Sequence, residues 1–248
     1  MSEIAIKLTD IEKSFAGQVV HSGLNLEIPK GKTSVIVGHS GAGKSVMLKY
    51  ILGLIAPDSG EVLLEGHDIT KLNQSKLYEI RSKFGVLFQG AALLDSLNVY
   101  DNVALPLREK TKLNEGEIKK SVMEKLDLMG IATSIHKFPA ELSGGMQKRV
   151  GLARALQRQP EIVLFDEPTT GLDPETTHNI YKLFKSTQKA LGYTAIIVSH
   201  DIPKVFSIAD YVAVLFNGAI KDFLTPDEIE ESGNEWLNKL IRIEKEVI

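Results

Sequence analysis

The sequence predicts an α/β protein with a mostly parallel β-sheet that helices cover on both faces. Apolar segments of strand length recur along the chain, and stretches with helical periodicity separate those in its second half. Strands that alternate with helices are typical of parallel sheets, because each crossover helix packs against a face of the sheet. A glycine-rich loop between one strand and one helix, Gly38 to Ser45, agrees with this class.

The individual elements follow from local patterns. The expected strands are 4–8, 24–28, 33–37, 61–64, 86–88, 162–165, 195–198 and 211–215. The expected helices are 46–54, 113–129, 146–157, 174–191 and 202–209. The region 90–158 is mostly helical in pattern and poor in β-branched runs, so we expect a helical insertion in the α/β core there.

Composition narrows the classes of function. The 248 residues suit one large domain, and the net charge of -3 gives no positive field that would attract nucleic acid. The chain has no cysteine, which excludes disulfides and thiolate metal sites. Met1 to Glu3 lack a signal-peptide pattern, and no apolar run approaches the roughly 20 residues of a membrane span. We therefore expect a cytoplasmic protein that reaches a membrane only through a partner.

The loop Gly38 to Ser45 has the pattern G-x-x-x-x-G-K-S between a strand and a helix. Its glycines let backbone amides converge on phosphate oxygens, and the N-terminus of the following helix adds a favourable field. Lys44 is expected to reach the β- and γ-phosphates, and the hydroxyl of Ser45 to bind Mg²⁺. His39 is expected to be a solvent-facing spacer. The predicted ATP contacts here are Gly38, Ser40, Gly41, Ala42, Gly43, Lys44, Ser45 and Val46.

A second cluster follows the apolar run 162–165, where Asp166 and Glu167 end a strand. Ligands of α/β sheets bind at the carboxyl ends of strands. Asp166 is expected to organise Mg²⁺, directly or through water, and Glu167 to face the attacking water. The alternative is a strand that ends in two solvated acids.

The segment Leu142-Ser143-Gly144-Gly145-Met146-Gln147 resembles the signature motif of ATP-binding-cassette (ABC) ATPases. A Ser-Gly-Gly turn that opens a helix is a second anion site, although Ser143 would serve equally as an ordinary helix cap. The resemblance implies a head-to-tail dimer in which Ser143, Gly144 and Gly145 complete the ATP site of a second copy.

Other motifs resemble that family in the same order. The resemblance assigns Gln89 to Mg²⁺ and water, Asp173 to a loop that crosses the dimer interface, and His200 to the γ-phosphate. Phe15 takes the place of the aromatic residue that stacks on adenine, with Val20 beside it; a core or turn role for Phe15 stays open. Glu167, His200 and Lys44 are the implied catalytic residues.

The resemblance also implies a fold: a P-loop NTPase of the ABC type, with a RecA-like parallel-sheet core, an antiparallel β subdomain and an α-helical subdomain. It divides the single domain 1–248 into a β subdomain and core, about 1–89 and 159–224, a helical subdomain, about 90–158, and a C-terminal helical tail, about 225–248.

Residues 88–109 are similar to those of Mla-type phospholipid-transporter ATPases. The resemblance implies a motor on the inner face of the cytoplasmic membrane. Its partners would be a permease, an MCE-domain protein and a small STAS-like regulatory subunit. Lipoprotein release and small-solute import are alternatives, because the Asn-Val-Ala-Leu-Pro-Leu piece occurs there too. A soluble non-transport ABC ATPase would show a second cassette, a coiled-coil insertion or a basic patch. A non-hydrolysing regulatory module would not need Glu167 and His200.

The end of the sequence differs from that subfamily, some members of which carry a long tail that grips a partner. Residues 234–247 can form one amphipathic helix, with Trp236, Leu237, Leu240 and Ile241 near one face. This face is expected either to pack on the protein's own core or to contact a partner.

Overall fold

The computed structural model describes residues 3–229 and Leu237. The chain folds into two compact units, which are described separately. Unit 1 comprises Met1–Arg81 and Tyr193–Ile248, and unit 2 comprises Ser82–Gly192. The finer division into the three segments expected from the sequence stays a prediction.

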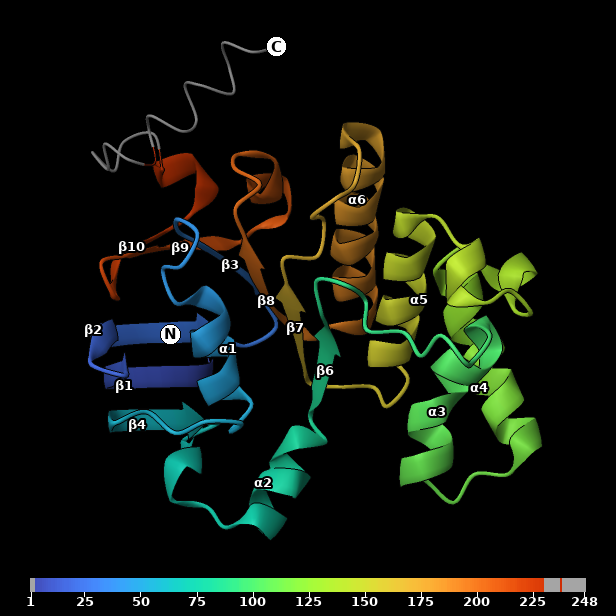
Figure 1. Cartoon of the computed structure of the whole chain (residues 1–248), viewed down its shortest axis with the longest axis horizontal. Helices are drawn as coiled ribbons and strands as arrows, with labels where there is room; N and C mark the ends of the chain where they lie inside the picture. The colour runs from blue at the N-terminus through green and yellow to red at the C-terminus, as the bar shows by residue number, and fades with distance from the viewer. Residues whose placement is uncertain (1–2, 230–236, 238–248) are drawn as a thin grey trace. The chain divides into compact units, whose positions relative to one another are not determined.

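Unit 1 contains an antiparallel sheet with strand order β2-β1-β4-β5. Figure 1 shows β1, β2 and β4 side by side. Leu8 lies at the centre, opposite Leu26 of one neighbouring strand and Val62 of the other, and all three are buried. The strands are β1 (Ile4–Phe15), β2 (Gln18–Pro29), β4 (Ser59–Leu64) and β5 (His67–Asp68).

Unit 1 also contains the strands β10-β9-β3-β8 in that order, and β3 pairs in parallel with both β8 and β9. All five residues of β3 are buried, as its β-branched sequence predicts. These strands are β3 (Thr33–Val37), β8 (Thr194–Ser199), β9 (Tyr211–Phe216) and β10 (Ala219–Leu224). The helices of the unit are α1 (Lys44–Ile51) and α2 (Gln74–Arg81), with short 3₁₀ turns Ile69–Lys71, Lys204–Ile208 and Pro226–Glu228.

Unit 2 contains the parallel pair β6 (Phe84–Leu87) and β7 (Ile162–Asp166), together with helices. In Figure 1, α3, α4 and α5 lie together. The buried side chains Val103, Val122 and Val150 come from these three helices in turn. The helices are α3 (Val99–Lys110), α4 (Glu115–Leu128), α5 (Gly144–Ala155) and α6 (Pro174–Leu191), with 3₁₀ turns Ala132–Ser134 and Pro139–Glu141.

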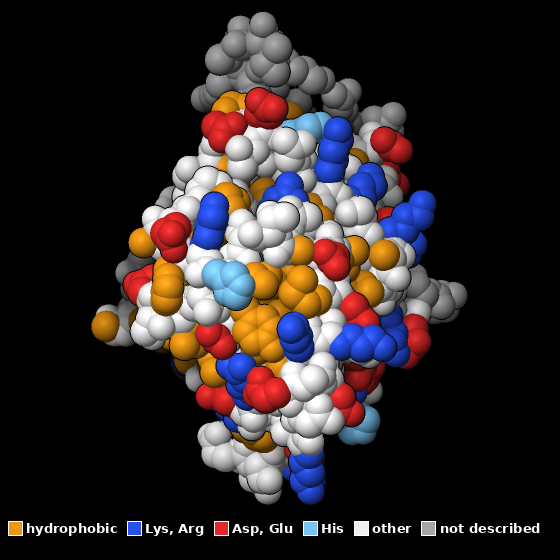
Figure 2. Space-filling model, turned by 90° about the vertical axis from the view of Figure 1, so that its right-hand side faces the viewer, with side chains coloured by type: hydrophobic (Ala, Val, Ile, Leu, Met, Phe, Trp, Pro, Cys, Tyr) orange, Lys and Arg blue, Asp and Glu red, His pale blue; other side chains and the backbone are white. Residues whose placement is uncertain are grey.

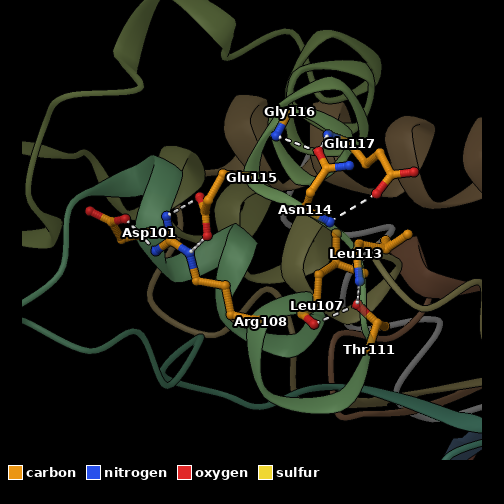
Figure 3. Close-up of polar contacts among 9 residues, drawn as sticks. All are labelled: Asp101, Leu107, Arg108, Thr111, Leu113, Asn114, Glu115, Gly116 and Glu117. Carbon is orange, nitrogen blue, oxygen red and sulfur yellow. Dashed lines mark hydrogen bonds and ion pairs between the residues drawn. The ribbon is translucent and has the colours of Figure 1, made fainter.

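An ion-pair network joins α3 to α4 (Figure 3). The Arg108 guanidinium donates to Asp101 at 2.7 Å and, through two nitrogens, to both carboxylate oxygens of Glu115 at 2.9 Å. Asn114 begins α4 by accepting from the backbone amides of Gly116 and Glu117, while the Glu117 side chain accepts from the Asn114 amide. The turn between the two helices is thus fixed by local polar contacts.

The α/β fold class is confirmed, but several elements differ from those expected. The expected helix 202–209 is only a 3₁₀ turn over Lys204–Ile208, in which the Phe206 amide donates to the Pro203 carbonyl and the Ala209 amide donates to the Phe206 carbonyl, each three residues back. Strands β5 and β10 and helices α2 and α3 are not among the expected elements. The predicted C-terminal helix lies outside the described residues apart from Leu237, which is buried. In the described part of the chain, no helix is long and apolar enough to cross a membrane.

Candidate active site

The glycine-rich loop connects the buried end of β3 to the start of α1. Within it, the Ala42 amide donates to the His39 carbonyl at 3.1 Å, and the Met47 amide donates to Gly43 at 2.9 Å to start the helix. The Lys44 ammonium donates to the carbonyls of Gly38 at 2.8 Å and His39 at 3.2 Å, with only 7% of the residue exposed. A positive charge is therefore held inside a loop of backbone amides at a helix N-terminus, an arrangement suited to phosphate.

Two glycines of this loop have no room for a side chain. A Cβ at Gly38 would lie 2.5 Å from the Leu215 carbonyl oxygen. Gly43 has φ +96°, and a Cβ there would lie 2.5 Å from His21 Nε2 and 2.8 Å from Val20 Cγ1. Val20 and His21 therefore pack directly against the loop, so the position predicted for Val20 borders the phosphate site.

His21 was not singled out by the sequence analysis. Its side chain is 0% exposed, and its Nδ1 lies 2.9 Å from the hydroxyl of Tyr50 on α1. Nε2 makes no hydrogen bond within the described residues, and it faces Gly43. Burial lowers the pKa of His21 to about 4, partly opposed by the Gly43 backbone, so the ring is neutral at pH 7. Burial also raises the pKa of Tyr50. The sequence pattern does not indicate this burial of His21, because the inward alternation of Leu24, Leu26 and Ile28 would place residue 21 outward, and the pairing of β1 with β2 is irregular between His21 and Leu24.

The aromatic residue predicted to stack on adenine, Phe15, ends β1 and is 46% exposed. The ammonium of Lys13 lies 5.1 Å from the centre of its ring. Such exposure does not suit a core role for Phe15, whereas the alternative turn role and the predicted stacking on a base both stay open. His39 is exposed, as a spacer should be, and its ring meets Phe216 edge-on at 6.2 Å.

The register of unit 1 brings His200 to the same sheet edge as the loop. Val37 lies opposite Ser199 in the parallel pair of β3 and β8, so Gly38 and His200 each follow paired residues. His200 is exposed, while the Ser199 hydroxyl is buried and accepts from the Asp201 amide at 3.0 Å. The residue predicted to contact the γ-phosphate and the loop predicted to bind it thus share one edge.

Unit 2 has an equivalent edge. Leu87 of β6 lies opposite Phe165 of β7, so Asp166 at the end of β7 and Gln89 just after β6 both lie at the carboxyl end of this parallel pair. Asp166 and Glu167 are half-buried and Gln89 is exposed. Glu167 has φ +48°, a left-handed conformation that turns the chain sharply after the strand. The three residues predicted to act on Mg²⁺ and water therefore project from one edge of the sheet.

The predicted signature turn and the predicted interface loop also meet in unit 2. A Cβ at Gly145 would lie 2.6 Å from Thr176 Cγ2, and one at Gly144 would lie 3.0 Å from a Leu172 methyl. Ser143 caps α5 by accepting from the Met146 amide at 3.3 Å. Asp173 caps α6 at the Thr176 amide, 2.9 Å away, and the hydrogen bonds to Thr176 lower the pKa of Asp173. Both side chains thus cap helices, next to the glycine amides for which the sequence predicts a contact with the ATP of a second copy.

A family model described as ABC transporter matches residues 21–170, more than half of the chain. The chain belongs to the ABC transporter family. A second model, for an AAA domain, matches residues 139–207. This ABC ATPase is 45% identical over 91% of its length to the "Probable ribonucleotide transport ATP-binding protein mkl" of Mycobacterium leprae, of which it spans 67%. It is 42% identical over 87% of its length to the "Intermembrane phospholipid transport system ATP-binding protein MlaF" of Haemophilus influenzae, of which it spans 81%.

Solved structures of ABC ATPases share the fold of this chain. CbiO1 from Clostridium perfringens, described as part of the ABC transporter complex cbiONQ, matches with a TM-score of 0.87 and 30% identity over 98% of this chain and 100% of that one. The ATP-binding cassette MJ0796, a dimer in a post-hydrolysis state bound to ADP and Pi, matches with a TM-score of 0.80 and 32% identity over 89% of this chain and 98% of that one. This ABC ATPase accordingly binds and hydrolyses ATP.

The residues of this ABC ATPase also fit Mg²⁺. Ser45 is an exposed hydroxyl in the first turn of α1, and Gln89 and Asp166 offer amide and carboxylate oxygens, the ligands that Mg²⁺ prefers. Residues 3–229 and 237 contain no cluster of three or more His, Cys, Asp or Glu side chains that could hold an ion alone. Each of these groups by itself suits Mg²⁺, which is commonly bound by one or two protein groups together with substrate phosphates.

Proposed function

We propose that this ABC ATPase drives phospholipid transport across or between membranes, as the motor subunit of a transporter. The choice of phospholipid as substrate rests on the 42% identity to MlaF of H. influenzae, because the matched region spans 81% of that relative. The mkl relative has a name that points to ribonucleotides, but the matched region spans a smaller share of it, 67%. Ribonucleotide transport is therefore the second candidate.

The phosphate loop holds the triphosphate, with Lys44 and the backbone amides neutralising the β- and γ-phosphates. Glu167 takes a proton from the attacking water, whose oxygen bonds to the γ-phosphorus while the bond to the bridging oxygen of ADP breaks. His200 contacts the γ-phosphate and Gln89 orients the water. Ser45, Gln89 and Asp166 would hold Mg²⁺, which would supply charge neutralisation at the phosphate oxygens. Positioning and charge neutralisation are what phosphoryl transfer mainly requires.

Two copies of the chain form the complete site. The signature glycines Gly144 and Gly145 offer backbone amides at the start of α5, and Asp173 lies beside them through Thr176 and Leu172. In a head-to-tail pair, Ser143 and these glycines bind the γ-phosphate held by the loop of the other copy. The support is the dimeric MJ0796 cassette, which is 32% identical to this chain.

A permease holds this subunit at the inner face of the cytoplasmic membrane. An MCE-domain protein and a small STAS-like subunit complete the system. Hydrophobic side chains gather on the face of the protein shown in Figure 2. An apolar patch of this kind is typical of protein-interaction sites.

The site assignment is tested with Glu167→Gln and, as a matched control, Glu124→Gln on the exposed surface of α4. Glu167→Gln should bind ATP, accumulate a dimer in size-exclusion chromatography and lose hydrolysis by about 100-fold or more, in the range typical of a general base. Glu124→Gln should match the wild type. Wild-type turnover by Glu167→Gln would overturn the assignment of the base.

The transport assignment is tested by purification from native membranes, followed by reconstitution of the complex into vesicles. Co-purifying phospholipid, together with ATP-dependent loss of a fluorescent phospholipid from the vesicles, is the expected result. ATP-dependent uptake of ribonucleotide without movement of lipid would replace phospholipid by the second candidate.

A further inference from the structure

Two basic side chains of the signature helix α5 hold the loop that carries Gln89. The Lys148 ammonium donates a hydrogen bond to the backbone carbonyl of Gln89. The Arg154 guanidinium donates to the carbonyls of Ala91 and Ala92, each at 2.8 Å. One helix thus binds three backbone carbonyls within the four residues 89–92 that follow β6. All of these residues belong to unit 2.

Lys148 is buried and Arg154 is half-buried. Lys148 is only 5% exposed, and burial lowers the pKa of its ammonium. Burial also lowers the pKa of Arg154. Within the described residues neither side chain forms an ion pair with a carboxylate. Their hydrogen-bonding partners in the structure are the loop carbonyls, and charge-assisted hydrogen bonds of this kind are strong in a buried setting.

The loop itself is in a conformation that needs support. A turn is closed by the Ala91 amide, which donates to the Phe88 carbonyl at 2.9 Å. Ala91 and Ala92 then have φ of +58° and +48°, a left-handed backbone that is unfavourable for residues other than glycine. Arg154 binds both of their carbonyls. The contact therefore holds the chain in a shape that it would otherwise adopt rarely.

Helix and loop also approach each other closely between the two cations. Gly151 lies one turn from Lys148 and from Arg154, and a Cβ there would lie 2.7 Å from a Leu87 methyl and 3.2 Å from Ala91 Cβ. Packing this tight leaves little room for the loop to slide along the helix.

We propose that Lys148 and Arg154 are positioning residues that fix the main chain of the Gln89 loop to the signature helix, so that Gln89 is placed for hydrolysis only together with that helix. The inference rests on the roles proposed above for Gln89 and for the signature turn. Because α5 begins at Gly144, a γ-phosphate bound there acts on the same rigid helix that holds the loop. The hydrogen bonds use carbonyls, which leaves the Gln89 side chain exposed for the site.

The decisive comparison is between Lys148→Met, which keeps the apolar stem and removes the donor, and Lys148→Arg, which keeps a donor. Lys120→Met on the exposed face of α4 is the matched control. Lys148→Met should lower kcat by about 10- to 100-fold, the worth of one charge-assisted hydrogen bond, with ATP affinity within about 2-fold of wild type. Lys148→Arg should restore kcat so that the logarithm of the fold-loss is at most about half of that for Lys148→Met. Lys120→Met should have the wild-type kcat.

Two results would overturn the inference. One is a folded Lys148→Met protein with wild-type kcat. The other is a parallel loss of kcat, ATP affinity and melting temperature that Lys148→Arg does not recover, because that pattern marks general packing. The Glu167→Gln experiment is independent of the Lys148 variants. A wrong assignment of the catalytic site would therefore appear in the Glu167→Gln result and not in the Lys148 results.

Hydrogen exchange gives a second test that needs no change at Lys148. In the Glu167→Gln protein, ATP should protect the amides of residues 88–92 and those at the start of α5 over the same range of ATP concentration. Protection of the signature turn with no change in the loop would show that the two move separately, and the inference would be wrong.

Discussion

Acidification is expected to destabilise unit 1 through the imidazole of His21, which is buried against the phosphate loop. Its ring is 0% exposed, and its pKa is lowered from 6.5 to about 4 by that burial. Between these two values the unfolded chain binds a proton that the folded chain does not. The contribution of the neutral ring to stability is therefore full above pH 6.5 and is lost as the pH falls towards 4.

The size of the effect follows from the two pKa values. Between pH 6.5 and pH 5 the unfolded imidazole is mostly protonated and the folded one mostly neutral. Each pH unit in that interval costs about 1.4 kcal/mol, so the free energy of unfolding should fall by about 2 kcal/mol between pH 7 and pH 5 from this residue alone.

Other groups also titrate in this range, so the measurement compares variants. Urea unfolding of the wild type and of His21→Gln, which does not titrate, should be followed by circular dichroism at pH 7, 6 and 5. The wild type should lose about 2 kcal/mol more than His21→Gln over this range. His67→Gln removes an exposed histidine of the same unit and is the matched control for the substitution itself. Equal losses in the wild type and in His21→Gln would refute the reasoning.

Three further predictions concern single contacts. Gly43→Ala should weaken ATP binding by at least about 10-fold in a fluorescent-nucleotide titration, because its Cβ would lie 2.5 Å from His21 Nε2 in a backbone of positive φ. Asn102→Ala should lower the free energy of unfolding by about 2–3 kcal/mol in urea, because the buried amide donates to three carbonyls and accepts from Leu94. Arg108→Met should lower the melting temperature only slightly, and about 1 M salt should remove most of that difference, because its partners Asp101 and Glu115 are partly exposed.

The bounds of a helix or strand are predictable from the sequence where neighbouring residues alone determine where it begins and ends. Strand β3 was expected at 33–37 and is found there, because a β-branched run between a turn and the phosphate loop has few other structures open to it. Helix α6 was expected at 174–191 and is found there as well, with Asp173 as its cap, Pro174 in its first turn and Gly192 at φ +72° after its end. The phosphate loop is likewise identified by a local motif, the pattern G-x-x-x-x-G-K-S between a strand and a helix.

Contacts between segments far apart in the chain were not predictable from these patterns. Lys148 and Gln89 are separated by 59 positions, and nothing in the helical pattern around Lys148 indicates which carbonyl it meets. The closeness of His21 to Gly43 depends on how β2 packs against the loop, which a single strand pattern does not specify. The helix expected at 202–209 is wrong: the segment forms a 3₁₀ turn of five residues, and its local sequence does not distinguish such a turn from a short α-helix.

The use of carbonyl oxygens by Lys148 and Arg154 bears on how this part of the protein can be engineered. Every amino acid carries the same carbonyl, so the helix places few demands on the identity of the residues that it holds. The stretch after β6 could be exchanged for that of another transport ATPase, provided that its path past Gly151 is kept. A library of such chimeras on a constant α5 would then separate the choice of membrane partner from the machinery of hydrolysis.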